Sequence, residues 1–211
     1  MGDNKKQPAE RPSLDAAEFP TLPSGVFVTP LRTHVDKRGS FTEVFRQTWF
    51  NEIVPIQWNF VASRANVLRG VHVHLRHSDY LILLSGRICV ALKDLRPASP
   101  TQGMATMIQM TGQALRSLII PPGVAHGFYF PEESTHVYAV SEYWSVDDEL
   151  GFHYADPGLH LTWPNPAPIV SPRDAALPPL SALAGVIPTW RPCESPLPAA
   201  AAESIAADIA T

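Results

Sequence analysis

Short runs of β-forming and apolar residues recur along this chain, and one of them, residues 40–46, roughly alternates polar and apolar side chains as a half-buried β-strand does. Such runs cover residues 25–29, 40–46, 80–84, 87–92, 115–120 and 136–140. Two of them flank Ser85-Gly86, which predicts a hairpin with a tight turn. Another run stops at the proline-glycine turn Pro121–Gly123. Short strands separated by glycine and proline turns predict an all-β sandwich or barrel.

Helical signals are weak by comparison. The best helix candidate is short and spans residues 48–53. The chain contains 22 prolines, which interrupt helices and are common at turns. We expect a disordered arm over residues 1–20, one folded domain over 21–180, and a Pro/Ala-rich tail over 181–211. Within this tail, residues 199–210 are expected to form at most a weak helix.

Composition excludes several classes of protein. Only 17% of the 211 residues are charged and the net charge is -4, whereas a nucleic-acid-binding protein normally shows a basic excess. No segment resembles a signal peptide or approaches the ~18 apolar residues of a membrane span. We therefore expect a cytoplasmic protein without nucleic-acid or membrane partners. Cys89 lies in an apolar run and is expected to be a buried thiol, and with Cys193 it makes no disulfide framework.

Three histidines occupy positions that suggest a site. His72 and His74 are two residues apart, so on a strand they face the same way. His126 follows the turn Pro121–Gly123. Strands from these two segments can bring the three imidazoles into the mouth of one barrel, which is a common place for a small-molecule site.

A series of short motifs occurs in order between residues 25 and 180. The motifs are DKRGSFTE at 36–43, QWN at 57–59, RGVH at 69–72, DLR at 94–96, IPPGVAHGF at 120–128, Tyr138, Glu142-Tyr143, Glu149, Asp156-Pro157, Trp163-Pro164 and SPRD at 171–174. The series resembles the dTDP-4-dehydrorhamnose 3,5-epimerase family, and a full set in register is far more specific than any single motif. The resemblance implies a cupin, a double-stranded β-helix jelly-roll barrel with short peripheral helices, and a homodimer.

The resemblance also implies a reaction. The family epimerises C3 and C5 of a nucleotide-linked 4-keto-6-deoxy sugar, whose ketone acidifies the neighbouring C–H bonds. By resemblance His72 is the base, with Asp174 as its carboxylate partner. Tyr138 is the acid, since a phenol with a pKa near ~10 is suited to protonating an enolate. No cofactor and no metal are implied.

The remaining matched residues are implied to bind the nucleotide sugar. They are Arg38, Phe41, Glu43, Gln57, Asn59, Arg69, His126, Glu149 and Arg173. Arginine suits diphosphate oxygens because a guanidinium pairs with them bidentately. Arg69 also suits the enolate oxygen. In the family the N-terminal strands are exchanged across the dimer, so Arg38 and Glu43 would serve the partner's site.

Two positions depart from the family pattern. His74 stands where the family usually has glutamine, and Asp79 stands where it has lysine. The loop between His72 and Asp79 is also shorter than usual. A carboxylate in place of a cation works against stabilising an enolate. Either Arg69 and His74 supply the positive charge instead, or the activity is narrowed or changed relative to that of the family.

Other chemistries stay open. The set His72, His74, Asp79 and His126 resembles the general metal-binding cupin pattern and would suit Fe(II), Mn(II), Ni(II) or Zn(II). Residues 69–74 (RGVHVH) also resemble cupin-type sugar 3,4-ketoisomerases, in which two bases on one strand would move a proton between C3 and C4. A single-centre epimerase and a binding protein without turnover are further alternatives.

Overall fold

The computed structural model describes residues 19–49, 53–183 and 185–190 of the chain. Strands dominate these ranges: β1 Phe27–Pro30, β2 Thr33–Asp36, β3 Gly39–Thr42, β4 Gln57–Ser63, β5 Val67–Val73, β6 Asp79–Ser85, β7 Arg87–Asp94, β8 Ala105–Thr111, β9 Arg116–Ile120, β10 Val124–Phe130, β11 Ser134–Val140 and β12 Leu150–Gly151. Helical segments are only three or four residues long: η1 Gln47–Trp49, η2 Val146–Asp148, η3 Pro157–Leu159, α1 Pro172–Ala175 and η4 Leu180–Leu183. The all-β prediction is confirmed.

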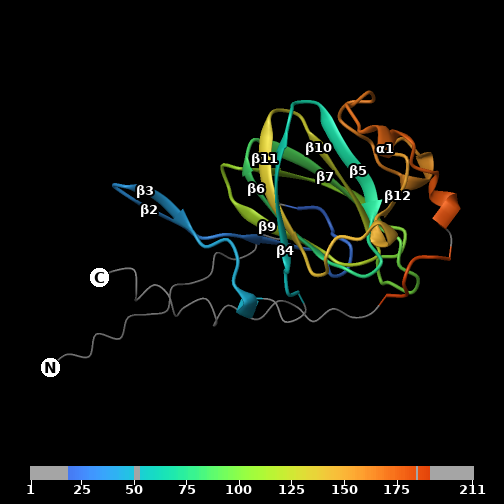
Figure 1. The fold of residues 1–211 in the computed structure, drawn as a ribbon, viewed down its shortest axis with the longest axis horizontal. Coiled ribbons are helices and arrows are strands. Elements are labelled where there is room, and N and C mark those ends of the chain that lie inside the picture. The colour runs from blue at the N-terminus through green and yellow to red at the C-terminus, as the bar shows by residue number, and fades with distance from the viewer. Residues whose placement is uncertain (1–18, 50–52, 184, 191–211) are drawn as a thin grey trace.

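The strands form two five-stranded antiparallel sheets that face each other (Figure 1). One sheet has the order β1-β9-β6-β11-β4 and the other β12-β5-β10-β7-β8. Their inner faces meet in one apolar core, to which the first sheet contributes Leu81 and Leu118 and the second Val90 and Phe130. All four side chains are essentially inaccessible to solvent, so this half of the barrel is filled with side chains.

The hairpin predicted around Ser85-Gly86 is confirmed. Strands β6 and β7 turn at Gly86, which has φ +79°, a conformation that favours glycine. A Cβ atom there would also collide with the side chain of Ser134. Glycine is therefore required at this turn for two independent reasons.

Two expected elements are corrected by the structure. The strand expected over residues 40–46 ends at Thr42, and the helix expected over 48–53 is the single turn η1 at Gln47–Trp49, with residues 50–52 outside the described ranges. Strands β2 and β3 pair only with each other and project from the barrel as a hairpin (Figure 1). Residues 43–46 pack against β4 and β6 through the ring of Phe45 but pair with no strand of the described chain, so alternation alone does not make them a strand.

Both ends of the described chain pack on the barrel. Phe19 and Leu22 contact the main core, and Leu183 and Ile187 contact a second cluster around Phe152. Packed residues thus extend past the boundaries expected at residues 20 and 180. Cys89 is a buried free thiol, as expected, whereas the tail from residue 191 lies outside the described ranges. No described helix is long and apolar enough to cross a membrane.

The DLR motif holds the loop between β7 and β8. Asp94 is fully buried and accepts hydrogen bonds from the Arg96 guanidinium at 2.8 and 2.9 Å and from the hydroxyls of Ser99 and Thr101, both at 2.6 Å. Arg96 also donates to the carbonyl of Ser24, at 2.6 Å, which ties the N-terminal segment to this loop. The motif therefore has a structural role.

Candidate active site

A cavity of about 510 Å³ opens between the two sheets, a volume suited to a small molecule. Strands β4, β6 and β11 line one wall, and β5 and β10 line the other. The loop 169–171 and helix α1 close one side. The cavity therefore collects residues that lie as far apart in sequence as Gln57 and Asp174.

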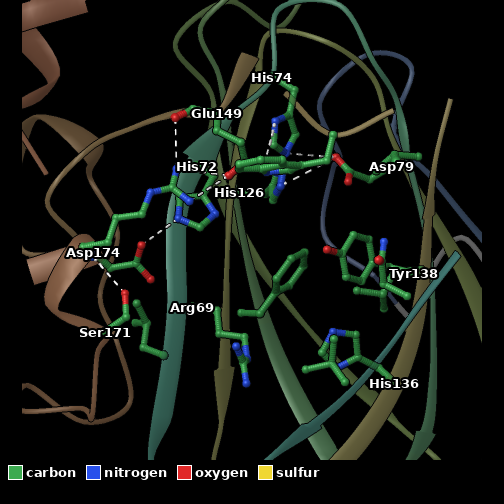
Figure 2. Close-up of a pocket in the computed structure, with 18 of the residues that line it drawn as sticks. Arg69, His72, His74, Asp79, His126, His136, Tyr138, Glu149, Ser171 and Asp174 are labelled. Carbon is green, nitrogen blue, oxygen red and sulfur yellow. Dashed lines mark hydrogen bonds and ion pairs between the residues drawn. The ribbon is translucent and has the colours of Figure 1, made fainter. Parts of the chain in front are cut away.

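His72 and Asp174 form a close pair at this cavity. His72 Nε2 lies 2.8 Å from Asp174 Oδ1 (Figure 2). Asp174 also accepts the backbone N–H of Gly70, at 3.2 Å, and its own N–H donates to Ser171 Oγ, which caps α1. Burial by itself would raise the pKa of Asp174, but these hydrogen bonds, led by that from His72, hold it below its usual value. An ionised aspartate keeps the proton on Nε2 and leaves Nδ1 able to accept another.

Gly70 explains why the RGVH motif contains glycine. Its φ is +110°, and a Cβ atom there would lie 2.8 Å from the carbonyl oxygen of His126 on β10. A larger residue would therefore force β5 and β10 apart. The glycine lets the two strands that carry His72 and His126 run side by side, with these two residues in register.

Tyr138 lies on the opposite sheet from His72. It belongs to β11, where it is paired with Leu81 of β6 and Asn59 of β4, and it lines the cavity. Figure 2 shows it across the cavity from His72 and Asp174. Burial raises the pKa of Tyr138, and the carboxyl groups of Asp79 and Glu149 raise it further. The phenol is therefore protonated at neutral pH and available as a proton donor.

Six of the nine residues predicted to bind substrate line the cavity: Gln57, Asn59, Arg69, His126, Glu149 and Arg173. The Arg69 Nε donates to Ser63 Oγ at 3.1 Å, which directs its guanidinium toward the end of β4. The half-exposed Arg173 pairs with Glu149 at 3.1 Å. The cavity thus has two guanidinium groups at its edge.

The other three predicted residues do not reach the cavity of their own chain. Arg38 and Phe41 lie on the hairpin formed by β2 and β3, and Glu43 follows it (Figure 1). Arg38 pairs with Asp36 at 2.6 Å, and Glu43 pairs with Arg46 at 2.8 Å. A direct role for them in the cavity of the same chain is therefore excluded in this conformation.

A second group of polar side chains lies deeper in the same cavity. The Nε2 atoms of His74 and His126 lie 3.6 and 3.7 Å from Asp79 Oδ2. Burial, followed by the nearby charge of His77, lowers the pKa of His74 to about 4, and burial and His74 lower that of His126 well below its usual value. Burial also raises the pKa of Asp79. His72 is not part of this group because its Nε2 is held by Asp174, so the four-residue metal set expected as an alternative reduces to three.

Sequence reasoning missed His77 and His136, which also line the cavity. His136 precedes Tyr138 by two residues on β11, so the period of a strand could have placed it on the same face. His77 lies in the loop between β5 and β6, where no periodic signal exists. Its Nδ1 lies 2.7 Å from Asp148 Oδ2, a contact across 71 residues that only the fold creates.

Comparison with known proteins identifies the family. The family model described as dTDP-4-dehydrorhamnose 3,5-epimerase matches residues 21–182. A dTDP-4-dehydrorhamnose 3,5-epimerase from Shigella flexneri is 32% identical over 148 residues, 66% of this chain and 82% of the relative. A dTDP-4-dehydrorhamnose 3-epimerase from Streptomyces niveus is 30% identical over 182 residues, 81% of this chain and 88% of the relative.

A solved structure agrees with these sequence matches. The dTDP-6-deoxy-D-glucose-3,5-epimerase of Legionella pneumophila, solved in complex with dTDP-4-keto-L-rhamnose, superposes with a TM-score of 0.73 and 29% identity. The match covers 79% of this chain and 94% of that structure. The resemblance read from the motifs is thereby confirmed, and so is the cupin fold that it implied. The chain belongs to the dTDP-4-dehydrorhamnose 3,5-epimerase family and is an isomerase of that class.

Proposed function

We propose that the chain epimerises a dTDP-linked 4-keto-6-deoxy sugar at the carbons beside the ketone, C3, C5 or both. The observation that carries this proposal is the placement of His72, paired with Asp174, and Tyr138 on opposite walls of one cavity. Inversion of a carbon requires a proton to leave from one face and another to arrive at the other. A base and an acid on facing sheets meet that requirement.

The proposed reaction begins with proton abstraction. His72 Nδ1 takes the proton from the carbon beside the ketone, and the electron pair of the C–H bond forms an enolate with its negative charge on the ketone oxygen. Asp174, at 2.8 Å, stabilises the imidazolium that results. Tyr138 then gives its phenolic proton to the opposite face of the carbon, and both groups recover their protonation states by exchange with water.

Binding of the nucleotide is proposed for the outer part of the cavity. Arg173 and Arg69 offer guanidinium groups to the diphosphate and the enolate. Gln57 and Asn59 project from β4 toward the cavity and offer amide hydrogen bonds to the sugar or base. Arg173 now pairs with the carboxylate of Glu149, so we expect a diphosphate to compete with Glu149 for it.

The hairpin formed by β2 and β3 is proposed to complete the site of a second copy of the chain. It projects from the barrel with Phe41 55% exposed, and Arg38 beside it cannot reach the cavity of its own chain. The outer face of the edge strand β4 carries Trp58 and Phe60, which are 44% and 67% exposed. Exposed aromatic residues on a sheet edge are typical of an interface. An Arg38→Ala variant is expected to lose substrate affinity. When it is mixed with an equal amount of a His72→Ala variant, half of the Arg38→Ala chains are expected to pair with a His72→Ala chain. In such a mixed dimer the intact hairpin of the His72→Ala chain restores the site in the barrel of the Arg38→Ala chain.

Solvent exchange tests the proposed reaction. The protein is mixed with dTDP-4-keto-6-deoxyglucose in heavy water, and the C3 and C5 protons are followed by NMR. Deuterium at both carbons with inverted configuration indicates a 3,5-epimerase, and deuterium at C3 or C5 alone indicates a single-centre epimerase. Movement of the ketone to C3, or no exchange at either carbon, would contradict the proposal.

A further inference from the structure

Three buried side chains converge on one point in the inner part of the cavity. His74, Asp79 and His126 have 5%, 6% and 3% of their surface exposed, and Figure 2 shows them pointing toward one another. Asp79 Oδ2 lies 3.6 Å from His74 Nε2 and 3.7 Å from His126 Nε2. These distances are too long for hydrogen bonds. The three side chains therefore face one another without forming hydrogen bonds to one another.

Backbone carbonyls orient both imidazoles toward this point. His74 Nδ1 lies 3.1 Å from the carbonyl oxygen of Asp148, and His126 Nδ1 lies 3.1 Å from that of Val124. A carbonyl can only accept, so each Nδ1 carries the proton and each Nε2 presents a lone pair. A carbonyl or carboxylate that fixes the far nitrogen is typical of metal-binding histidines.

Asp79 supplies the third donor. Its Oδ2 is buried and has no hydrogen-bond donor within the described part of the chain. Burying an unpaired carboxylate is unfavourable unless a cation or a proton neutralises it. Two ligands at about 2.0–2.1 Å from a tetrahedral zinc ion stand about 3.3 Å apart. The observed separations of 3.6 and 3.7 Å need to close by only a few tenths of an ångström.

A neighbouring group of His74, His77 and Asp148 does not offer such a site. Asp148 Oδ1 already accepts the backbone N–H groups of Leu75 and Arg76, at 2.7 and 3.2 Å, and Oδ2 lies 2.7 Å from His77 Nδ1. Its carboxylate is therefore occupied. This group fixes the loop whose carbonyl, at Asp148, orients His74.

We propose that His74, Asp79 and His126 bind one divalent transition-metal ion, with an open coordination position facing the cavity. Two imidazoles and one carboxylate suit Zn(II), Mn(II), Fe(II) or Co(II). Three protein ligands with a free position are typical of catalytic rather than structural metal sites. If the proposed function holds, the ion polarises the ketone and stabilises the enolate oxygen, a role that rests on that function.

Metal content tests the site itself. Protein without a histidine tag is stripped with a chelator, reloaded separately with Zn(II), Mn(II) or Co(II), desalted and assayed by elemental analysis. About one ion per chain is expected for the unmodified protein, and at least a 100-fold weaker affinity for Asp79→Asn and His74→Gln. His160→Asn is the matched control, because it removes an exposed imidazole outside the cavity and asparagine tolerates its left-handed φ of +55°.

A second readout covers the case in which a variant is destabilised. Metal is expected to raise the thermal midpoint of the unmodified and His160→Asn proteins and not that of Asp79→Asn, each measured against its own metal-free form. Less than about one tenth of an ion per chain, or equal binding by Asp79→Asn, would overturn the site.

The same samples separate this proposal from the proposed function. Heavy-water exchange at C3 or C5 that falls on stripping and returns on reloading supports both. Full exchange in protein that binds no metal overturns the metal site and leaves the epimerase proposal intact. Stoichiometric metal binding without any exchange supports the site and contradicts the epimerase proposal.

Discussion

Two buried aspartates of this barrel have opposite environments. Asp94 ends β7 and Asp79 begins β6, and both are shielded from solvent. The oxygens of Asp94 accept bonds from the Arg96 guanidinium and backbone N–H, and from two hydroxyls. Asp79 Oδ2 accepts none within the described residues.

This difference in hydrogen bonding distinguishes an aspartate that stabilises the fold from one that serves the cavity. A buried polar atom without a partner destabilises a fold by about 1–3 kcal/mol, and more if it is charged. The barrel can satisfy a buried aspartate, as Asp94 shows, so the unpaired Asp79 reflects a local requirement of the cavity. We infer that the Asp94 network stabilises the fold and that the cavity keeps its polar groups available for a ligand.

Removing the charge of Asp94, the aspartate whose hydrogen bonds are all made, should have the largest effect on stability. Asp94→Asn leaves the Arg96 guanidinium buried without its anionic partner. The free energy of unfolding is expected to fall by about 3–5 kcal/mol, measured by urea denaturation. Activity per folded molecule should be unchanged, because Asp94 does not line the cavity. A loss below about 1 kcal/mol would show that this network is not what holds the loop.

Removing the charge of an aspartate that lines the cavity should lower activity rather than stability. Asp174→Asn keeps the shape of the side chain but removes the charge that fixes the His72 tautomer. We expect kcat to fall by about 100-fold or more, with the free energy of unfolding changed by about 1 kcal/mol or less. Ser171→Ala is the control: it removes the cap of α1 but leaves the carboxylate, so its main effect should be on stability, by about 1 kcal/mol. Equal kinetic losses in the two variants would contradict a specific role for the charge.

The pH dependence of stability sharpens the comparison at a third buried group. Burial, and secondarily the charge of Arg69, lowers the pKa of His136 from 6.5 to about 4. Between these values the unfolded chain binds a proton that the folded chain does not, so stability falls as the pH falls from 6.5 to 4. The loss from this residue is up to about 3 kcal/mol, at about 1.4 kcal/mol per pH unit. Denaturation of His136→Gln across this range should show a correspondingly shallower loss, and an unchanged slope would refute the assignment.

The smallest effect is expected at an exposed ion pair. Arg87, at the start of β7, and Glu132, in the turn between β10 and β11, lie 3.1 Å apart with exposed side chains. Glu132→Gln should change the free energy of unfolding by about 1 kcal/mol or less, because solvent screens such a pair. A loss as large as that from Asp94→Asn would mean that burial is not what distinguishes the charges of this protein.

The sequence predicted the barrel best where apolar residues point inward. The strand at β4 was missed because its pattern is reversed: Gln57, Asn59 and Val61 face the cavity, and the aromatic rings of Trp58 and Phe60 face outward. In this strand the polar side chains face inward and the apolar side chains face outward, so the usual rule that apolar positions mark the buried face gives the wrong orientation. Function in the cavity overrides the usual burial preference at this strand.

The motifs predicted the His72 and Asp174 partnership across 102 residues, and the 2.8 Å contact between them agrees. The metal-binding alternative also grouped His74, Asp79 and His126, but it included His72, whose Nε2 lies 2.8 Å from Asp174 instead. The motifs did not predict how the two imidazoles are held: the carbonyl of Asp148, 74 residues from His74, and the carbonyl of Val124, two residues before His126, each lie 3.1 Å from an Nδ1 atom. Residue spacing therefore suggested which residues come together, whereas the direction in which each imidazole points is known only from the folded chain.

Deuterium incorporation by His72→Ala and Tyr138→Phe tests the central claim, that base and acid face each other across the cavity. Each variant is incubated with dTDP-4-keto-6-deoxyglucose in heavy water, and exchange and configuration at C3 and C5 are read by NMR. We predict that His72→Ala exchanges at least about 100-fold more slowly than the unmodified protein, and that Tyr138→Phe exchanges protons but fails to complete inversion. Normal exchange by His72→Ala, or normal inversion by Tyr138→Phe, would contradict the assignment.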